Sequence, residues 1–572
     1  MSRTLLLTAT VLTSLLAPGR AQNSGPTMDW PQKTFEDSLA RYKECLKRKA
    51  FLFHWQAREV LGHLGSPEAL PLLADDYHHV KEYAEYVRYT IAEVFGRSFG
   101  RQEFVDRLRA LRGSHRGPGD VWLWYQTLRT QVDAEGDAEA VQVATTDKSA
   151  PLRAAAILAL GDSRNGSIKG AIVPNCVEFP RKDSDRMVLL GAMTGALYGN
   201  RARVNDDDYR SALTAYIGLL EDPVGLSHTA KVQMARHLQI ILKAPGTYMN
   251  PEAWLEILSH GEVKTPARQT TTASPRFFGI ETDGDRLVYV VDMSDSMLKE
   301  IEPSAKPQGP LTGPRQKKKK GALLDESDIP WNLIKTRWDL ARENLRISLS
   351  RLTPDKEFCV VWFGSEAGTL DACKGMVKAS RANTDRVMAE LDAVKPRTTP
   401  DPQIQNEIMP PEGKLRGDTN LHGGLRLAYA LHSRGFASDF AYVDPRALTE
   451  GCDTILLLTD GDPSVDDFTL LETNYREGKV IHSFERGEAA PDTPTVRYSG
   501  PFVSQGIPEC PTLVADVRRM NAFRRVRMHA VGFGEANMKL LRLLADIGQG
   551  ESFAVGSRKP DAGEGAGDKS GK

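Results

Sequence analysis

The sequence predicts an all-helical region followed by a doubly wound, mostly parallel α/β domain, so the expected fold class is α plus α/β. Two observations predict it. Residues 32–260 carry apolar side chains at helical spacing in one segment after another. From about residue 278, short and continuously apolar runs alternate with amphipathic helices instead. Such runs are typical of parallel strands that are buried on both faces of a sheet.

The first 21 residues have the pattern of a signal peptide. Arg3 supplies a positive charge, residues 5–16 are mostly apolar, and Gly19 and Ala21 are small residues before a cleavage point at Gln22. The apolar run is short for a bilayer span, and no later stretch reaches 18 uninterrupted apolar residues. We therefore expect an exported protein in the periplasm, the cell envelope or the extracellular space. No transmembrane segment is expected beyond the signal peptide, and the alternative is an uncleaved N-terminal anchor.

Composition excludes several classes of protein. The 74 Lys and Arg residues nearly balance the 75 Asp and Glu residues, which leaves a formal charge of −1. A globally basic nucleic-acid binder is excluded, and no nucleic-acid partner is expected. The six cysteines contain no C-x-x-C pair, which argues against zinc and thioredoxin-type sites. In an oxidising compartment, Cys452 and Cys510 are one conceivable disulfide pair.

The helical region repeats one kind of segment, an amphipathic helix that ends in a turn. In residues 57–77, apolar side chains follow helical spacing on both sides of a Gly65-Ser66-Pro67 turn, where the proline can open the next helix. Similar segments occur at 151–165, 185–200 and 229–246. Helix pairs of this kind bury their apolar faces only by stacking on neighbours. The pattern resembles degenerate HEAT-like repeats, and the alternative is an irregular helical bundle.

Residues 261–277 are polar and rich in Thr, Ser and Pro, and they predict a linker between two regions. The α/β domain is expected over 278–556, and residues 557–572 are expected to form a disordered tail. Four apolar runs predict its strands, at 286–297, 357–366, 453–461 and 526–535. Long insertions interrupt this domain at 298–331, 396–416 and 462–509. We expect them to form a rim or lid on one side of the sheet, the alternative being solvated loops.

Oxygen-bearing side chains follow two of these strands and precede one helix. Asp292, Ser294 and Ser296 end the first strand, Thr419 precedes the helix that starts near Leu421, and Asp460 ends the strand at 453–461. In doubly wound folds, ligands bind beyond the carboxyl ends of the strands. Carboxylate and hydroxyl oxygens select Mg²⁺, or Mn²⁺, over soft metals. The sequence therefore predicts a divalent metal site made by these five residues.

The D-x-S-x-S motif at Asp292–Ser296, the threonine in "GDTNLHGGL" and the aspartate in "LLLTDGD" resemble the metal-ion-dependent adhesion site of von Willebrand factor A domains. The resemblance covers about residues 278–556. Placed behind helical repeats, the domain also resembles bacterial exported proteins that combine HEAT-like repeats with such a domain. The resemblance implies that the three hydroxyls are direct or near-direct ligands and that the two carboxylates ligate directly or through water.

In that family, one coordination position stays open for an acidic side chain of a partner protein. Asp295 departs from the usual glycine, and its carboxylate could raise cation affinity or fill the open position. His422, close after Thr419, is expected on a helix surface or at the rim.

We therefore expect a divalent-cation-dependent protein-binding protein in adhesion or envelope assembly. The helical repeats would offer a second surface for a second protein. One alternative is a structural scaffold, in which the metal only stabilises loops and the repeats bind the partner. Another is a metal-assisted hydrolase, which needs a general base, and only spare carboxylates such as Asp295 or Asp462 could serve. No catalytic constellation is recognisable, so we do not expect an enzyme.

Overall fold

A computed structural model describes residues 33–261, 274–282, 284–306, 323–394, 415, 417–437, 442–473, 495–504 and 506–555. The predicted signal peptide and tail lie outside the described residues. So do most of the predicted linker and of the 396–416 insertion, and the middle parts of the other two insertions.

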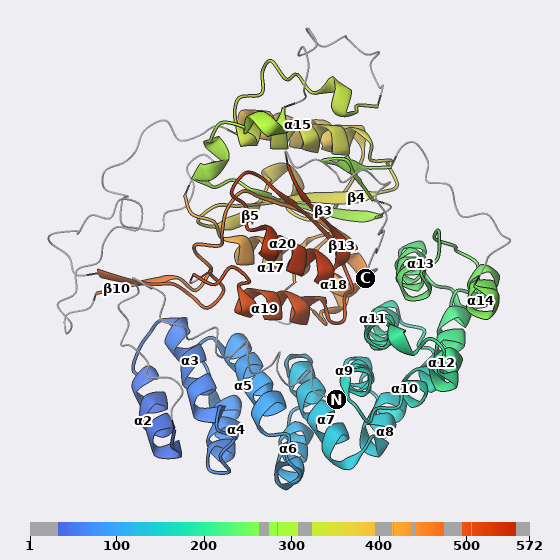
Figure 1. Ribbon diagram of the computed structural model, residues 1–572, viewed down its shortest axis with the longest axis vertical. Coiled ribbons are helices and arrows are strands. Elements are labelled where there is room, and N and C mark those ends of the chain that lie inside the picture. Colours follow the sequence, from blue (N-terminus) through green and yellow to red (C-terminus); the bar gives the residue numbers. More distant parts are fainter. Residues whose placement is uncertain are drawn as a thin grey trace, which may run out of the picture.

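The N-terminal region is all-helical, as predicted, and its helices stack in two layers along an arc (Figure 1). The inner layer consists of α3 (Phe51–Gly62), α5 (Ala84–Ser98), α7 (Val121–Glu135), α9 (Ala150–Asp162), α11 (Asp183–Gly199) and α13 (His228–Leu242). The outer layer consists of α2 (Phe35–Cys45), α4 (Ala69–His79), α6 (Gln102–Ser114), α8 (Ala138–Thr146), α10 (Ile168–Val177), α12 (Asp207–Gly218) and α14 (Pro251–His260). Short 3-10 turns lie at η1 (Pro118–Asp120), η2 (Arg201–Arg203) and η3 (Asp222–Val224).

Small residues allow these helices to approach one another closely. Ala154, Ala155 and Ala159 of α9 are completely buried between its neighbours. The predicted turn after α3 also forms. Gly65 there has a φ of +61°, and a side chain on it would clash with the carbonyl oxygen of Ser98. A left-handed backbone in such close contact favours glycine at this position.

The second region is built on a mostly parallel sheet, as predicted. Its strands follow the order β13-β12-β9-β3-β4-β5, with β6 also paired to β4. The parallel strands are β3 (Arg286–Asp292), β4 (Glu357–Phe363), β9 (Thr454–Thr459), β12 (Arg527–Gly532) and β13 (Gln549–Ala554). The short strands β5 (Ala367–Thr369) and β6 (Val377–Lys378) run antiparallel to β4. Strand β13 was not predicted, because its sequence QGESFA is not continuously apolar. In the structure, this strand is partly exposed along its length.

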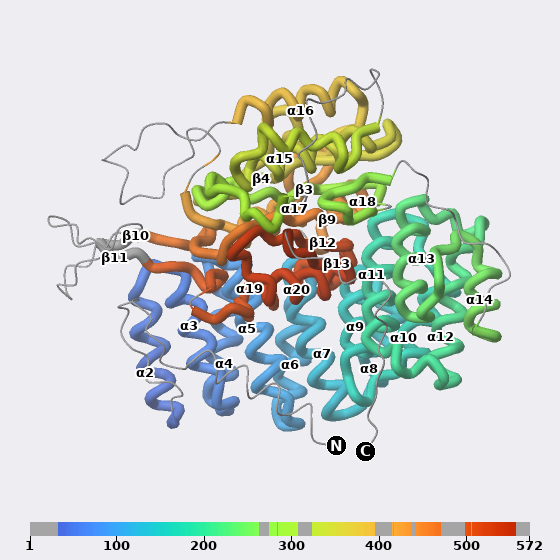
Figure 2. Tube along the Cα trace, turned by 45° about the horizontal axis from the view of Figure 1, so that its top comes forward, coloured from blue at the N-terminus to red at the C-terminus, as the bar shows by residue number. Residues whose placement is uncertain are grey.

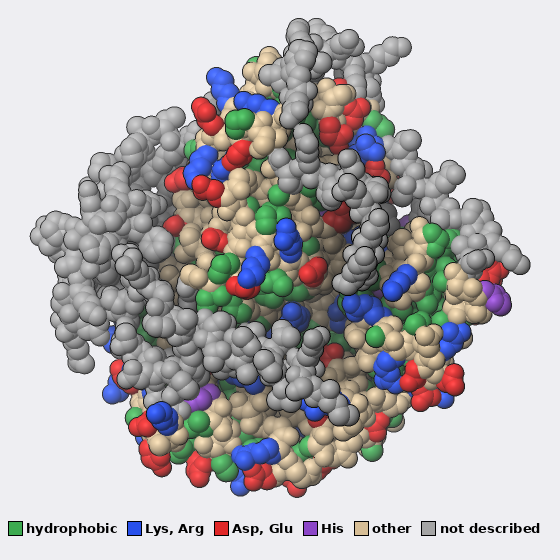
Figure 3. All heavy atoms as spheres, in the orientation of Figure 1, with side chains coloured by type: hydrophobic (Ala, Val, Ile, Leu, Met, Phe, Trp, Pro, Cys, Tyr) green, Lys and Arg blue, Asp and Glu red, His purple; other side chains and the backbone are tan. Residues whose placement is uncertain are grey.

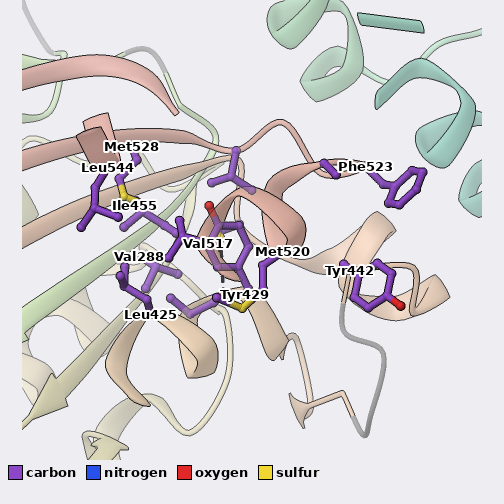
Figure 4. Packing of buried hydrophobic residues seen from close by; sticks show 14 of the residues in the cluster. Val288, Leu425, Tyr429, Tyr442, Ile455, Val517, Met520, Phe523, Met528 and Leu544 are labelled. Carbon is purple, nitrogen blue, oxygen red and sulfur yellow. Dashed lines mark hydrogen bonds between the residues drawn. The ribbon is translucent and has the colours of Figure 1, made fainter. Parts of the chain in front are cut away.

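Helices cover both faces of the sheet (Figures 1 and 2). On one face lie α15 (Arg337–Ser350) and α16 (Arg381–Ala393), and on the other lie α17 (Leu421–Ala430), α19 (Pro511–Asn521) and α20 (Met538–Ile547). Figure 4 shows the core under the second face, where Val288, Ile455 and Met528 of the strands meet apolar side chains of these helices.

The remaining elements are short. They are the hairpins β1–β2 (Arg276–Phe277, Ile280–Glu281), β7–β8 (Leu431–His432, Gly435–Phe436) and β10–β11 (Leu470–Thr473, Thr495–Tyr498), helix α18 (Pro445–Glu450), and the turns η4 (Asp295–Leu298), η5 (Pro303–Ala305), η6 (Glu326–Asp328) and η7 (Asp371–Cys373). Phe277 of β1 packs on Tyr289 of β3, with ring centroids 5.7 Å apart. The residues just before the predicted start of the α/β domain thus pack on its sheet.

The inner layer of the arc packs against the α/β region (Figure 1). Helix α11 contacts α18. At the N-terminal end of the arc, the ring of Phe51 lies 4.5 Å from that of Phe468. Toward the other end, Nδ1 of His237 lies 2.6 Å from Oε1 of Gln549. One continuous apolar core includes residues of both regions. Figure 3 shows acidic and basic side chains interspersed along the outer edge of the arc. None of the described helices combines the length and the apolar character that a membrane crossing needs.

Candidate metal centre

The five residues named from the sequence surround the carboxyl ends of two central strands. Strand β3 has β4 on one side and β9 on the other, so the chain order of the strands changes direction beside β3. Asp292 is the last residue of β3, and Asp460 follows the last residue of β9. In open α/β sheets, this is the place where ligands bind.

Four of the five residues form one hydrogen-bonded chain. Oδ1 of Asp292 accepts from the backbone N–H of Ser294 at 2.8 Å. The hydroxyl oxygens of Ser294 and Ser296 lie 2.9 Å apart, and the Ser296 hydroxyl donates to Oδ1 of Asp460 at 2.5 Å. The second oxygen of Asp292 accepts from the hydroxyl of Thr459 at 2.6 Å. The carboxylates at the ends of two strands are thus linked through Ser294 and Ser296, by the backbone N–H of Ser294 and the hydroxyls of both serines.

The hydroxyl of Thr419 joins this group around Gly461. A Cβ atom placed on Gly461 would lie 3.4 Å from the Thr419 Oγ1 and 3.9 Å from the Ser296 Oγ. Both hydroxyls therefore face one small space that a methyl group would enter. The loop is held by Ser464, whose hydroxyl accepts from the Thr419 N–H at 2.9 Å. Asn420, rather than Thr419, caps α17 through its contact with the N–H of Gly423.

The two carboxylates are buried next to each other. Asp292 is 0% exposed and Asp460 is 1% exposed. Burial, together with the charge of Asp460, raises the pKa of Asp292 to about 7. A cation between the two carboxylates would offset both effects. The donors are oxygen atoms alone, which fits Mg²⁺ or Mn²⁺.

In the described part of the chain, no group of three or more His, Cys, Asp or Glu side chains is arranged to hold a metal ion. The candidate centre is of another kind, because it combines two carboxylates with three hydroxyls. Its residues would hold the ion, and the ion would supply a positive charge that a further carboxylate could approach.

Two charged residues at the centre were not predicted. Nη1 of Arg337, the first residue of α15, donates to Oδ2 of Asp460 at 2.7 Å. Its Nε donates to Oε1 of Glu302 at 3.1 Å. The sequence places Arg337 after Thr336, which caps the helix, but nothing local indicates that its side chain turns toward a distant strand end.

The neighbouring candidates lie apart from the centre or at its edge. Asp295 is exposed at the rim, and its backbone N–H donates to the Gly417 carbonyl at 3.1 Å. Asp462 is exposed and accepts from the side chain of Asn537 at 2.6 Å. Cys452 and Cys510 are both free thiols, so the conceivable disulfide between them does not form in this structure.

The expectation that His422 lies on a helix surface or at the rim is wrong. Its side chain is 0% exposed, because α17 packs this face against α19. Its Nε2 lies 2.7 Å from Oδ2 of Asp516, and its ring stacks on Phe502 with centroids 3.9 Å apart. Burial lowers the pKa of His422 to about 4, so the imidazole is neutral at pH 7.

A scan of the sequence against models of known protein families finds no match, and a search of curated proteins finds none either. The likeness to a von Willebrand factor A domain stays a prediction, which rests on the motif residues alone.

Proposed function

We propose that this protein binds Mg²⁺ or Mn²⁺ at Asp292, Ser294, Ser296, Thr419 and Asp460, and uses the bound ion to capture an acidic side chain of a protein partner. One observation carries this proposal. The five side chains come from three segments that are far apart in the sequence, at 292–296, 419 and 460, yet their oxygen atoms gather at one edge of the sheet.

The chemistry of the group supports an ion rather than an organic ligand. Two buried carboxylates lie beside each other, and apart from Arg337 only neutral donors contact them among the described residues. Buried charges are usually paired or ligate metals. A doubly charged ion held by two carboxylates and three neutral hydroxyls keeps enough positive character to attract another carboxylate.

The likeness to the adhesion site of von Willebrand factor A domains supports the same function, and the likeness of the helical region to HEAT-like repeats supports a bacterial exported protein of this kind. We infer that the protein acts in adhesion or envelope assembly, in the periplasm, the cell envelope or the extracellular space. Because the inner layer of the arc packs on the α/β region, a second partner would bind the outer layer of the helices.

Ion binding is the first test. Titration of the full chain with Mn²⁺, followed by electron paramagnetic resonance, should show one site that is lost in Asp292→Asn and in Thr419→Val. Asp453→Asn provides a matched control, because Asp453 is also buried but precedes β9 and binds the backbone N–H groups of Asp285 and Arg286 at the opposite end of the strand. If Asp292→Asn and Thr419→Val bind Mn²⁺ as tightly as the wild type and the Asp453→Asn control, the proposed site is wrong.

Partner capture is the second test. Affinity capture from an envelope extract is run with Mg²⁺ and with EDTA, using the wild type, Thr419→Val and Asp453→Asn. We expect a partner that is retained only with Mg²⁺ and only by proteins with an intact Thr419. If Thr419→Val melts at a lower temperature but retains the same partner, the ion is structural and the helices are the binding surface.

A further inference from the structure

The guanidinium group of Arg337 places a positive charge at the candidate metal centre. Its side chain is 5% exposed, and Nη1 donates to Oδ2 of Asp460 at 2.7 Å. Of the two oxygens of Asp460, one therefore binds the Ser296 hydroxyl and the other binds a guanidinium. Removing one partner of a buried ion pair leaves an uncompensated charge, so Arg337 stabilises the ion-free form of this edge of the sheet.

Glu302 is the second anion that contacts Arg337. Its Oε1 accepts from Nε of Arg337 at 3.1 Å and also from Nη2. Its Oε2 is buried and has no hydrogen-bond partner among the described residues. An unsatisfied carboxylate oxygen beside a guanidinium can accept a further N–H without any rearrangement of the backbone.

Gly534 lies directly against this pair. It has a φ of +47°, and a side chain on it would clash with both Nη2 of Arg337 and Oε1 of Glu302. The loop after β12 thus leaves room for the guanidinium and the carboxylate side by side. The nearby ion pair between Lys299 and Glu535 lies at the surface, and its members are 53% and 79% exposed.

From these contacts we propose that Arg337 is an exchangeable counter-ion of the metal centre. Without a divalent ion, Arg337 neutralises Asp460. When an ion is bound, Arg337 releases Asp460 and its Nη1 turns to the unsatisfied oxygen of Glu302. Arg337 therefore lowers the affinity of the centre for the ion and keeps the protein folded while the centre is empty. This inference rests on the proposed function, since it requires that the centre binds a divalent ion.

The test compares Arg337→Met with the wild type and with Arg342→Met. Methionine keeps an unbranched side chain and removes the charge. Arg342 lies on the same helix, but its ion pairs are with Asp339, Glu343 and Asp392 and not with residues of the centre. Loss of a positive charge so close to the ion should tighten Mn²⁺ binding on the order of tenfold or more. The melting temperature of Arg337→Met should fall strongly in EDTA and recover with Mg²⁺, while Arg342→Met should behave like the wild type.

Glu302→Gln tests the other half of the exchange, and it does so even if Arg337→Met fails to fold. With a neutral amide at this position, Arg337 has no second anion to bind and stays on Asp460. We expect Mn²⁺ binding to weaken by roughly tenfold. Unchanged or weaker Mn²⁺ binding by a folded Arg337→Met, or unchanged binding by Glu302→Gln, overturns the exchange.

The controls separate the two proposals. If the wild type binds Mn²⁺ and Asp292→Asn does not, the metal centre stands, and only the role of Arg337 is decided by its variants. If the wild type itself binds no Mn²⁺, the metal centre and the exchange both fail.

Discussion

Nε of Arg525, in the α/β region, donates a hydrogen bond to the carbonyl oxygen of Gly191, in the helical arc, at 3.2 Å. Arg525 has a φ of +50°, a backbone conformation that is strained for a residue with a side chain. Beside this contact, the carbonyl oxygen of Phe523 approaches Gly191 so closely that a Cβ atom would clash with it. The two regions therefore meet along backbone as well as side chains, and glycine makes this approach possible.

Gly191→Ala should destabilise the protein because the added methyl group forces the two regions apart. We expect a loss of about 3 kcal/mol in the free energy of unfolding, as for other overpacked buried positions, and a lower melting temperature. The matched control is Gly113→Ala, since Gly113 also lies in a helix but a Cβ atom on it would meet only open space. That control should be neutral or stabilising by up to about 1 kcal/mol. Equal melting temperatures for the two variants would contradict the packing described above.

Gly461→Ala should weaken ion binding without disturbing the fold. The new methyl group would make ordinary contacts with the hydroxyls of Thr419 and Ser296, at 3.4 and 3.9 Å, and would occupy the space that both face. We expect Mn²⁺ affinity to fall at least about tenfold, because each ligand displaced from an ion of fixed geometry weakens binding strongly. Thermal unfolding in EDTA serves as the control and should match the wild type. Unaltered Mn²⁺ affinity would mean that the ion does not bind beside Gly461.

Phe468 connects the loop after Asp460 to the first helices of the arc. Its ring lies 4.5 Å from Phe51 and 4.9 Å from Tyr86. Phe468→Ala should lower the free energy of unfolding by about 2 kcal/mol, because the half-buried ring loses its contacts with the buried rings of Phe51 and Tyr86. Phe436→Ala is the control, since Phe436 is 41% exposed and its loss should cost less than about 0.5 kcal/mol. Denaturant unfolding measures both. Hydrogen exchange should also speed up around Ser464 in the first variant alone.

His237 makes the stability of the protein depend on pH. Its Nδ1 lies 2.6 Å from Oε1 of Gln549, while burial and the charges of Arg525, Arg236 and Arg527 lower its pKa to about 3. The unfolded chain therefore binds a proton at His237 below a pH of about 6.5, and the folded protein does not, so stability falls as the pH decreases below that value.

His237→Gln keeps a hydrogen-bond donor toward Gln549 and removes this titration. Relative to the variant, the wild type should lose about 2 kcal/mol of stability between pH 7.5 and pH 5. Thermal unfolding of both proteins across this range measures the difference. Parallel pH profiles would show that His237 does not titrate on unfolding.

Much of the candidate centre could be predicted because its signals are local in the chain. Apolar runs marked β3 and β9, and Asp292 and Asp460 stand at the ends of these runs, so both had to lie at the carboxyl edge of a parallel sheet. No comparable sequence pattern indicates that Arg337 and Glu302 lie at the centre. A charged residue in the first turn of a helix normally points to solvent, and only the packing of α15 beside the end of β9 directs this one inward.

Patterns among neighbouring residues were enough to predict the order of the two regions, the mostly parallel sheet and the five oxygen-bearing residues at its edge, because helical spacing, apolar strands and strand-end motifs are all local in the chain. Three other features follow from packing between distant segments: the inner layer of the arc lies on the α/β region, His422 is buried against Asp516, and Arg337 reaches Asp460. These contacts join residues far apart in the chain. Their partners are chosen by the shape and charge of surfaces that exist only once both regions have folded.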